Sequence, residues 1–314
     1  MTPTAIGVDV GGTKVNALRV TADGKVLDRA TLPTPEDADT PVDVLIDAAR
    51  AVLDVDVSVI GVGAAGLLER STGVMRFAPN IAWRDAPILA RVHEAFGLPT
   101  VVDNDCTTAT FGEWRLGAGR GHDDVLYVGV GTGIGGGIVM GGSLQRGARG
   151  FAGEIGHLVV EPDGPVCGCG NHGCWEVVAS GNAIMRDGAA AVTRHEHSAI
   201  AILAGGEPDR VTGALVSQAA RDGDATALGI LAEVGHRLGQ GIAGLVNVLD
   251  PSIVIVGGGV AEAGEQLLVP ARASYLTHVE GRELRADVGI VEAELGPDGA
   301  AIGAAVLAME EAAP

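Results

Sequence analysis

The feature that most constrains the fold is a glycine-rich hairpin pattern that occurs twice in the chain. Residues 7–14 read GVDVGGTK and residues 129–137 read GVGTGIGGG, and each turn lies between apolar runs. Such runs on either side of a glycine turn predict a strand, a tight turn and a second strand. Strand and helix patterns alternate after each hairpin, so we expect two α/β halves.

The order of the other elements agrees with two halves. Residues 5–32 predict three antiparallel strands, followed by a helix over 41–53, a strand over 57–63, a helix over 85–96 and a strand over 100–105. Glycine, arginine and aspartate dominate 117–124, where we expect the chain to cross between domains. The second half predicts a long helix that ends at Asp250-Pro251, a strand over 253–256 and a final helix over 299–310.

The predicted fold is therefore α/β and two-lobed, an actin/hexokinase-like (ribonuclease H-like) ATPase architecture with a cleft between the lobes. We expect residues 1–118 to form the smaller lobe, joined by the C-terminal helix at about 299–314. Residues 119–298 are expected to form the larger lobe, which would carry a zinc-binding loop.

Composition narrows the class of protein. A formal net charge of -19 opposes loose binding to nucleic acid or to anionic membranes and favours small-molecule partners. No stretch approaches the roughly 20 apolar residues of a membrane span, and the first residues do not resemble a signal peptide, so a cytoplasmic location is expected. Four cysteines are too few for a disulfide scaffold and indicate metal binding or catalysis in a reducing compartment.

The first hairpin resembles a P-loop but lacks its order, because the lysine follows the threonine and a strand follows the turn. Its exposed amides would still suit phosphate, and Asp9 is placed to reach a hydrated Mg²⁺. The predicted phosphate-binding residues are Gly11, Gly12, Thr13 and Lys14. An ordinary hairpin is the alternative.

The second hairpin contains a formal dinucleotide fingerprint, with glycines at 131, 133 and 136. A strand pattern follows it, so no helix dipole would meet a pyrophosphate, and a second phosphate-binding hairpin is the better interpretation. Its candidate residues are Gly131, Thr132 and Gly133. The strand over 253–256 also runs into a glycine turn, where an adenosine could lie against Gly257, Gly258 and Gly259.

Asn104 and Asp105 stand at the carboxyl end of a predicted strand, where α/β proteins tend to place catalytic groups. The Asp105 carboxylate could accept the proton of an attacking hydroxyl, as in phosphoryl transfer. The alternative is a helix cap, since both residue types are favoured there. Asp103 should point away from Asn104 and is the weaker candidate.

Three cysteines fall in the segment CGCGNHGCWE, and a histidine precedes it. Three thiolates and an imidazole form a standard tetrahedral zinc set, here His157, Cys167, Cys169 and Cys174. The C-x-C spacing does not match the redox C-x-x-C motif, and His172 is the second choice for the nitrogen ligand. Cys106 reads as a buried hydrophobe, with a reactive thiol as the alternative.

Two glutamates, Glu154 and Glu176, bracket this segment. Carboxylates held near a tethered loop could accept hydrogen bonds from the hydroxyls of a polyol. The alternative is that both are simply exposed to solvent.

Together these motifs resemble the ROK family of sugar kinases and repressors. The most specific match is residues 153–181, GEIGHLVVEPDGPVCGCGNHGCWEVVASG, similar to the family's Glu-x-Gly-His motif and its Cys-x-Cys-Gly-x-x-Gly-Cys-x-Glu signature. The two glycine hairpins match its phosphate loops, and the resemblance spans nearly the whole chain.

The resemblance implies an ATP-dependent hexose kinase that acts on glucose, with Mg²⁺ and a structural Zn²⁺ as cofactors. Asp105 resembles the catalytic base and Asp9 the residue near Mg²⁺ and the transferred phosphate. The residues that resemble sugar ligands are Gly66, Asn80, Asn104, Glu154, His157 and Glu176, and His157 would also ligate the zinc. The residues that resemble nucleotide contacts are Gly12, Thr13, Thr132, Gly133 and Gly258. The family forms homodimers and homotetramers.

Some positions depart from the family's common pattern, which leaves the substrate open. Cys106-Thr107 and Val177-Val178 replace other pairs, and residues 63–66, GAAG, lack a frequent proline. Mannose, fructose, N-acetylglucosamine or N-acetylmannosamine are alternatives to glucose, and polyphosphate is an alternative donor. A sugar-responsive repressor would need a DNA-binding domain before the first strand, which begins at about Ile6. A zinc-bearing sugar-binding protein without activity would leave Asp105 and the paired hairpins unexplained.

Overall fold

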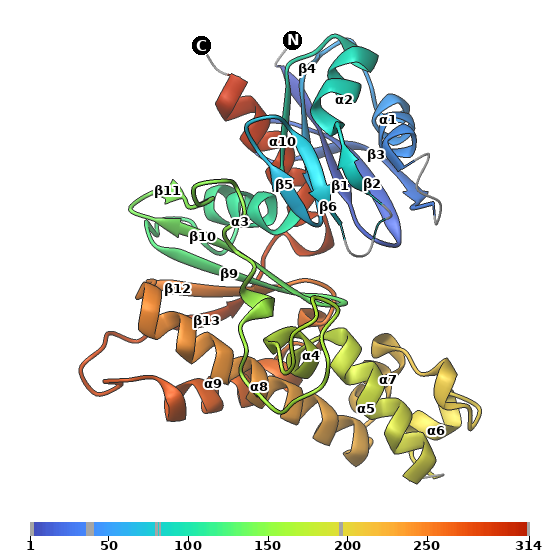
Figure 1. The fold of residues 1–314 in the computed structure, drawn as a ribbon, viewed down its shortest axis with the longest axis vertical. Coiled ribbons are helices and arrows are strands. Elements are labelled where there is room, and N and C mark those ends of the chain that lie inside the picture. The colour runs from blue at the N-terminus through green and yellow to red at the C-terminus, as the bar shows by residue number, and fades with distance from the viewer. Residues whose placement is uncertain (1–2, 36–40, 79–80, 82, 195–196, 313–314) are drawn as a thin grey trace. The chain divides into compact units, whose positions relative to one another are not determined.

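The computed structural model describes residues 3–35, 41–78, 81, 83–194 and 197–312 (Figure 1). Contacts divide the chain into two compact units. The first unit comprises residues 1–127, 136–153 and 293–314, and the second comprises 128–135 and 154–292. The first unit is therefore assembled from three stretches of the chain, and the C-terminal segment is one of them.

The first unit contains a five-stranded sheet in the order β3-β2-β1-β4-β8. The opening hairpin and its third strand are antiparallel, whereas β4 and β8 run parallel to β1. The strands are β1 Thr4–Val10, β2 Lys14–Val20, β3 Val26–Pro33, β4 Val57–Ala64 and β8 Thr100–Asn104. These are the strands that the apolar patterns predict.

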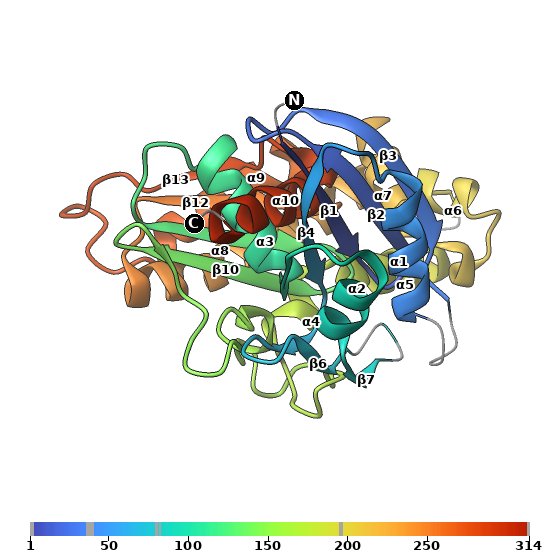
Figure 2. The same ribbon diagram turned by 90° about the horizontal axis from the view of Figure 1, so that it is seen from above.

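Alternation along β1 decides which helices cover which face. Ile6 and Val8 share a buried core with helices α1 (Pro41–Ala51) and α2 (Ile88–Phe96). The opposite side of β1 carries Gly7, where a Cβ would lie 1.8 Å from the carbonyl oxygen of Ala301. Helix α10 (Gly299–Ala312) therefore packs directly on this strand, beside helix α3 (Asp105–Leu116), as Figure 2 shows.

One predicted helix boundary was wrong. A small antiparallel sheet of β5 (Leu67–Glu69), β6 (Val74–Phe77) and β7 (Arg84–Ala86) occupies part of the range. Residues 85 and 86 therefore belong to a strand, and α2 begins only at Ile88, after Pro87. The residue before a proline is disfavoured in helical geometry, so the helix cannot start at 85.

The second five-stranded sheet has the order β11-β10-β9-β12-β13. Its strands are β9 Val125–Val130, β10 Ile134–Met140, β11 Ser143–Leu144, β12 Ile253–Gly257 and β13 Gly289–Glu292. The second glycine hairpin is thus present as β9, a turn and β10. The two sheets and their helices give the α/β class that the sequence predicts.

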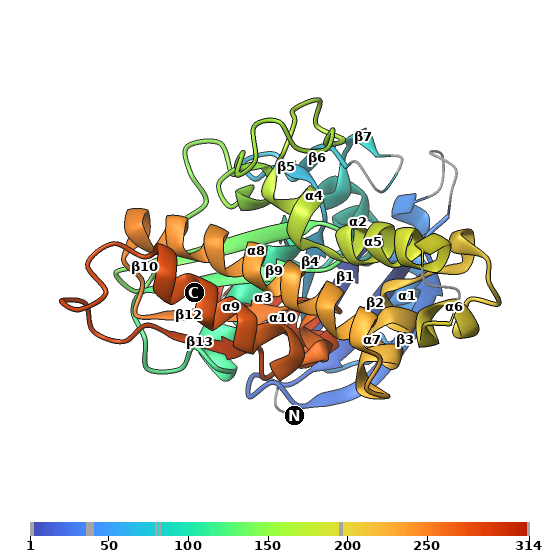
Figure 3. The same cartoon turned by 90° about the horizontal axis from the view of Figure 1, so that it is seen from below.

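Helices make up most of the second unit, and the long α8 packs against α9 (Figure 3). The α-helices are α4 Trp175–Ala179, α5 Gly181–Arg194, α6 Ala199–Leu203, α7 Gly213–Arg221, α8 Ala225–Leu249 and α9 Glu265–His278. The 3₁₀ turns of the chain are Ile155–His157, Pro208–Arg210, Ala261–Ala263 and Gly296–Asp298. Among the residues described, no helix combines the length and apolar character needed to cross a bilayer.

Candidate functional site

The side chain that caps helix α3 comes from the last residue of β8. Asn104 is the N-cap residue, and its Oδ1 accepts hydrogen bonds from the amides of Cys106 at 2.9 Å and Thr107 at 3.1 Å. Its Nδ2 donates to the carbonyl oxygen of Gly66 at 3.3 Å. Asp105 is the first residue of the helix, so Asn104 and not Asp105 occupies the capping position.

Asp9 and Asp105 are two electrostatically coupled carboxylates of the first unit. Burial, and then the charge of Asp105, raise the pKa of Asp9 to about 7, while Lys14 opposes the rise. Burial also raises the pKa of Asp105, against the amide of Cys106 and the side chain of Asn104. Each residue keeps part of its surface open to solvent. Asp9, with a pKa of about 7, can therefore take up a proton near neutral pH.

Gly63 of β4 explains how these carboxylates come near each other. In the sheet register Gly63 pairs with Asp9 on one side and Asp103 on the other. A Cβ at Gly63 would lie 2.4 Å from Oγ1 of Thr108 and 3.4 Å from Cα of Asp105. The missing side chain therefore lets the first turn of α3 approach the sheet beside Asp9.

The turn of the first hairpin presents exposed backbone. It closes with a hydrogen bond from the Gly11 amide to the Lys14 carbonyl at 3.0 Å, and Thr34 holds it from β3's end by bonds to the carbonyls of Gly11 and Thr13. Gly12, Thr13 and Lys14 are exposed. This geometry leaves amides, a hydroxyl and an ammonium for an anionic ligand.

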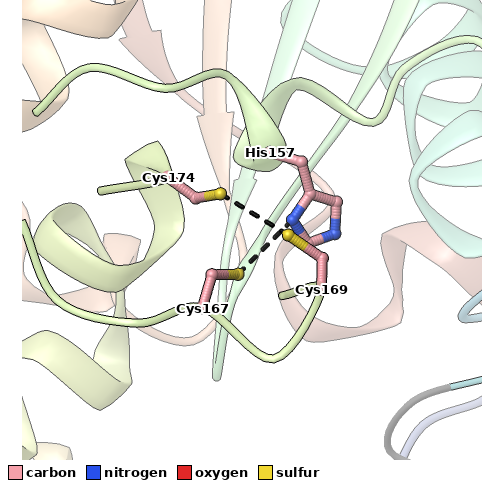
Figure 4. Close-up of side chains that lie close together, drawn as sticks. All are labelled: His157, Cys167, Cys169 and Cys174. Atoms are coloured by element: carbon pink, nitrogen blue, oxygen red, sulfur yellow. Dashed lines mark hydrogen bonds between the residues drawn. The ribbon is translucent and has the colours of Figure 1, made fainter. Parts of the chain in front are cut away.

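In the second unit the four predicted metal ligands come together (Figure 4). One donor atom from each lies within 4.8 Å of all the others. The His157 Nδ1 to Cys167 Sγ distance and the Cys169 Sγ to Cys174 Sγ distance are both 3.6 Å. A tetrahedral zinc with Zn–S bonds of about 2.3 Å requires S···S edges of about 3.8 Å, so the donor set fits zinc.

The thiols differ in their surroundings. Burial raises the pKa of Cys167 and of Cys174, whereas a hydrogen bond from the amide of Asn171 lowers the pKa of Cys169. A bound dication would favour the thiolate form of all three. His172 instead contacts the carbonyl oxygen of Gly164 at 3.3 Å and stands outside the four-residue set.

His157 links this cluster to both bracketing glutamates. Its Nδ1 lies 3.5 Å from Glu176 Oε1, and its Nε2 lies 3.9 Å from Glu154 Oε2. Glu176 also accepts a hydrogen bond from Cys167 Sγ at 3.1 Å. An imidazole and two carboxylates gathered in this way offer the donors and acceptors that suit a ligand with several hydroxyl groups.

The turn of the second hairpin is packed against helices of its own unit. The amides of Gly181 and Asn182, at the start of α5, donate to the carbonyls of Gly131 at 2.8 Å and Thr132 at 3.3 Å. A Cβ on Gly133 would lie 2.3 Å from Glu176 Oε2. Only glycine therefore allows this turn and the carboxylate to keep their places.

A cavity of about 450 Å³ opens beside this turn, within the range of small-molecule sites. The predicted residues Gly131, Thr132 and Gly259 line it. Helices α5 and α7 supply residues that sequence reasoning missed, among them Asn182, Ile184, Met185 and Ser217. Their patterns are those of ordinary amphipathic helices, which carry no signal for this role. Gly258 lies behind the turn, where a Cβ would be 2.5 Å from the Val130 carbonyl oxygen.

Asn80 lies outside the residues that the structure describes. Cys106 is partly exposed and free of a disulfide, next to Asp105. It is therefore less buried than the sequence analysis expects, because the first turn of α3 lies at the solvent-accessible end of β8.

Comparisons with known proteins show the family to which the chain belongs. The model of the ROK family matches residues 5–311. The chain is 40% identical to the glucokinase of Streptomyces coelicolor over 308 residues, 97% of each chain, and 36% identical to that of Thermotoga maritima over 316 residues, again 97% of each. It superposes with a TM-score of 0.92 on a ROK family glucokinase from Streptomyces griseus in complex with glucose and AMPPNP, at 42% identity, covering 98% of this chain and 99% of the other.

Proposed function

Because the chain belongs to the ROK family, we propose that it is an ATP-dependent glucokinase, which transfers the γ-phosphoryl group of ATP to the 6-hydroxyl of glucose. The similarity to glucokinases over 97% of the chain supports the reaction. The observation that carries the mechanism is the division of roles at the end of β8, where Asn104 caps the helix and the Asp105 carboxylate remains available.

In the proposed mechanism Asp105 is the general base. Its carboxylate takes the proton of the sugar 6-hydroxyl as the oxygen forms a bond to the γ-phosphorus. The bond between the γ-phosphorus and the β–γ bridging oxygen breaks, and ADP leaves with that electron pair. A carboxylate whose pKa burial raises is a stronger proton acceptor than an exposed one, provided that it is ionised when the sugar binds.

The acceptor sugar would be held by hydrogen bonds to many hydroxyl groups. We assign this role to Gly66, Asn80, Asn104, Glu154, His157 and Glu176. Glu154 and Glu176 lie on the two nitrogens of the His157 imidazole, and Asn104 bonds to Gly66. Each buried sugar hydroxyl needs a partner, and carboxylates are strong acceptors for it.

The nucleotide would lie in the 450 Å³ cavity of the second unit, with its phosphates near Thr132 and the amides of that turn. We assign Gly133 and Gly257 to Gly259 to the backbone that shapes this site, and Gly11 to Lys14 to phosphate contacts. A cavity that accommodates a base and a ribose favours a nucleotide donor over polyphosphate.

Zinc, if bound by His157 and the three cysteines, would supply a rigid anchor for the loop that carries Glu176, with no part in the chemistry. The Asp9 carboxylate fits a hydrated Mg²⁺, since that ion keeps several waters and takes one or two carboxylates. When bound there, Mg²⁺ would neutralise charge on the transferred phosphate.

The assembly as a homodimer or homotetramer and the cytoplasmic location stay predictions. Light scattering on the purified protein measures the first.

Substitution of Asp105 by asparagine tests the proposal. Loss of the base should lower kcat with glucose and Mg-ATP by at least about 10²-fold with little change in thermal stability. The matched control is Asp43→Asn, which removes an exposed carboxylate from the first turn of α1 and should leave kcat unchanged. ADP release is measured with glucose, mannose, fructose, N-acetylglucosamine and N-acetylmannosamine. Equal turnover by Asp105→Asn and Asp43→Asn would reject the base, and preference for another sugar would reassign the substrate.

A further inference from the structure

Four charged side chains of the first unit, Arg70, Asp103, Arg146 and Glu311, form one network, which we call the Asp103 clamp. Asp103 Oδ2 accepts from Nε of Arg146 at 2.6 Å and from Nε of Arg70 at 3.3 Å. Both guanidinium groups also reach Glu311 near the end of α10, Arg146 at 3.2 Å. Two cations and two carboxylates thus balance each other.

The clamp differs from the ion pairs on the protein surface. Exposed pairs contribute little, because water already solvates both charges. The Asp103 side chain, in contrast, is only 4% exposed. Its Oδ1 accepts the amide of Asn104 at 3.0 Å, so both oxygens are used. A buried carboxylate is costly unless it is fully paired, which suggests that this one is retained for the geometry it imposes.

The clamp joins three segments of the chain. Each of them lies within eight positions of a residue that we propose binds the sugar. Asp103 immediately precedes Asn104 and Asp105. Arg70 follows Gly66 by four positions, and the Gly66 carbonyl is already bonded to Asn104. Arg146 precedes Glu154 by eight positions.

The segment after Arg146 is also fixed against the segment of Arg70. The Ala152 amide bonds to the Arg146 carbonyl at 3.1 Å, which closes a loop. Within this loop a Cβ on Gly150 would lie 3.0 Å from the carbonyl oxygen of Leu68 and 3.3 Å from Cβ of Arg70. The loop and the end of β5 therefore pack backbone to backbone, and Arg146 anchors the loop at its start.

We propose that Asp103 and Arg146 are positioning residues for the acceptor sugar. Through one buried carboxylate the clamp sets the spacing of the segments that carry Gly66, Asn104 and Asp105, and it fixes the chain that continues to Glu154. Neither residue touches the reacting atoms. The inference rests on the proposed glucokinase function, because it is stated as an effect on sugar binding.

The test compares Arg146→Gln and Arg146→Lys with the control Glu310→Gln. Glu310 precedes Glu311 on α10 and pairs with Arg115 at 2.9 Å, outside the clamp. Arg146→Gln should raise KM for glucose by at least about tenfold and leave KM for ATP within about twofold, because a misplaced segment costs orientation of the sugar alone. Arg146→Lys keeps the charge but cannot serve both carboxylates, so it should recover part of the loss. Glu310→Gln should change neither constant.

If Arg146 only stabilised the fold, the Michaelis constants would change in a different way. If Arg146→Gln raised both Michaelis constants alike, or behaved like Glu310→Gln, the clamp would have no positioning role. Thermal unfolding of each variant shows whether it is folded, and Arg146→Lys keeps the test valid if Arg146→Gln is not. If the unchanged protein released no ADP with any sugar, the proposed function would fail and the clamp proposal with it. An active protein with an indifferent Arg146→Gln would overturn the clamp alone.

Discussion

The two glycine hairpins each place a glycine-rich turn between two strands, but the side chains that they carry differ. In both, the amide of the glycine after the first strand closes the turn, Gly11 onto Lys14 and Gly131 onto Gly133, at 3.0 Å in each case. The first carries Asp9 and Lys14, whereas the matching positions of the second are Gly129 and Ile134. The first turn is exposed, and the second is bonded to the start of α5.

This difference shows what a repeated turn can be used for. Where the strand carries a charged side chain, the hairpin can act on charge, and Asp9 gains a raised pKa from its burial. The second hairpin has Gly129 in place of Asp9, and its turn packs against the start of α5 and lines the cavity with Gly131 and Thr132. We therefore propose that the first hairpin stabilises charge during the reaction and that the second shapes the cavity.

The largest expected effect tests the charged hairpin. Asp9→Asn should lower kcat by about 10²-fold, the size typical of losing one charge-stabilising group. In the unchanged protein kcat should fall as pH drops through about 7, because Asp9 then takes up a proton. A pH–rate profile measures both, with Asp28→Asn on the exposed β3 as control.

The free energy of unfolding should change with pH in the opposite direction to kcat. The folded-state pKa of Asp9 is raised above its unfolded value of 3.8, so folded protein binds the proton more tightly, and stability falls as pH rises from about 4 to 7. Asp9→Asn removes a buried charge and should raise Tm at pH 8. A variant that loses both activity and stability at that pH would show that Asp9 acts through the fold.

Metal removal should distinguish the loop that holds Glu176 near the second hairpin from the first hairpin. If zinc holds His157 and the three cysteines, chelation frees the loop over 157–176, and its amides should exchange with deuterium faster. Residues 4–20 should keep their protection, because no predicted ligand lies there. Metal analysis before and after chelation is the control. Uniform loss of protection in both regions would contradict a local anchor.

The smallest expected effect tests the close-packed hairpin. Gly133→Ala places a methyl group 2.3 Å from Glu176 Oε2, so the flexible carboxylate must move away from His157. KM for glucose should rise by several-fold to about tenfold, with a destabilisation near the lower end of the 1–3 kcal/mol typical of overpacking. Gly131→Ala, whose Cβ meets nothing within 4 Å, is the matched control for KM of glucose. An unchanged KM in Gly133→Ala would separate Glu176 from sugar binding.

Sequence patterns located the elements of the site better than they located its contacts. The Cys167 to Cys174 spacing predicted a cluster that the structure brings together, because the ligands lie within one short loop. The pattern at Asn104-Asp105 left open which residue caps α3. That choice depends on the backbone of Asn104, whose extended conformation directs its side chain at the amides that follow.

Contacts between distant segments gave no sequence signal at all. The sequence made Asp103 a weaker catalytic candidate than Asp105. In the structure it pairs with Arg70 and Arg146, which are 33 and 43 positions away. The helices that line the cavity looked like any amphipathic helices. Their role follows from packing, which single-sequence patterns do not encode.

The sequence by itself determined the α/β class, the two glycine hairpins and the candidate metal ligands, because turn chemistry, strand alternation and ligand spacing act over a few residues. Only the tertiary structure decided that Asp9 is coupled to Asp105, that Glu176 rests against Gly133 and that one buried carboxylate ties three segments together. The physical reason is that burial and pairing of charge depend on which segments the fold brings into contact, and those segments are far apart along the chain.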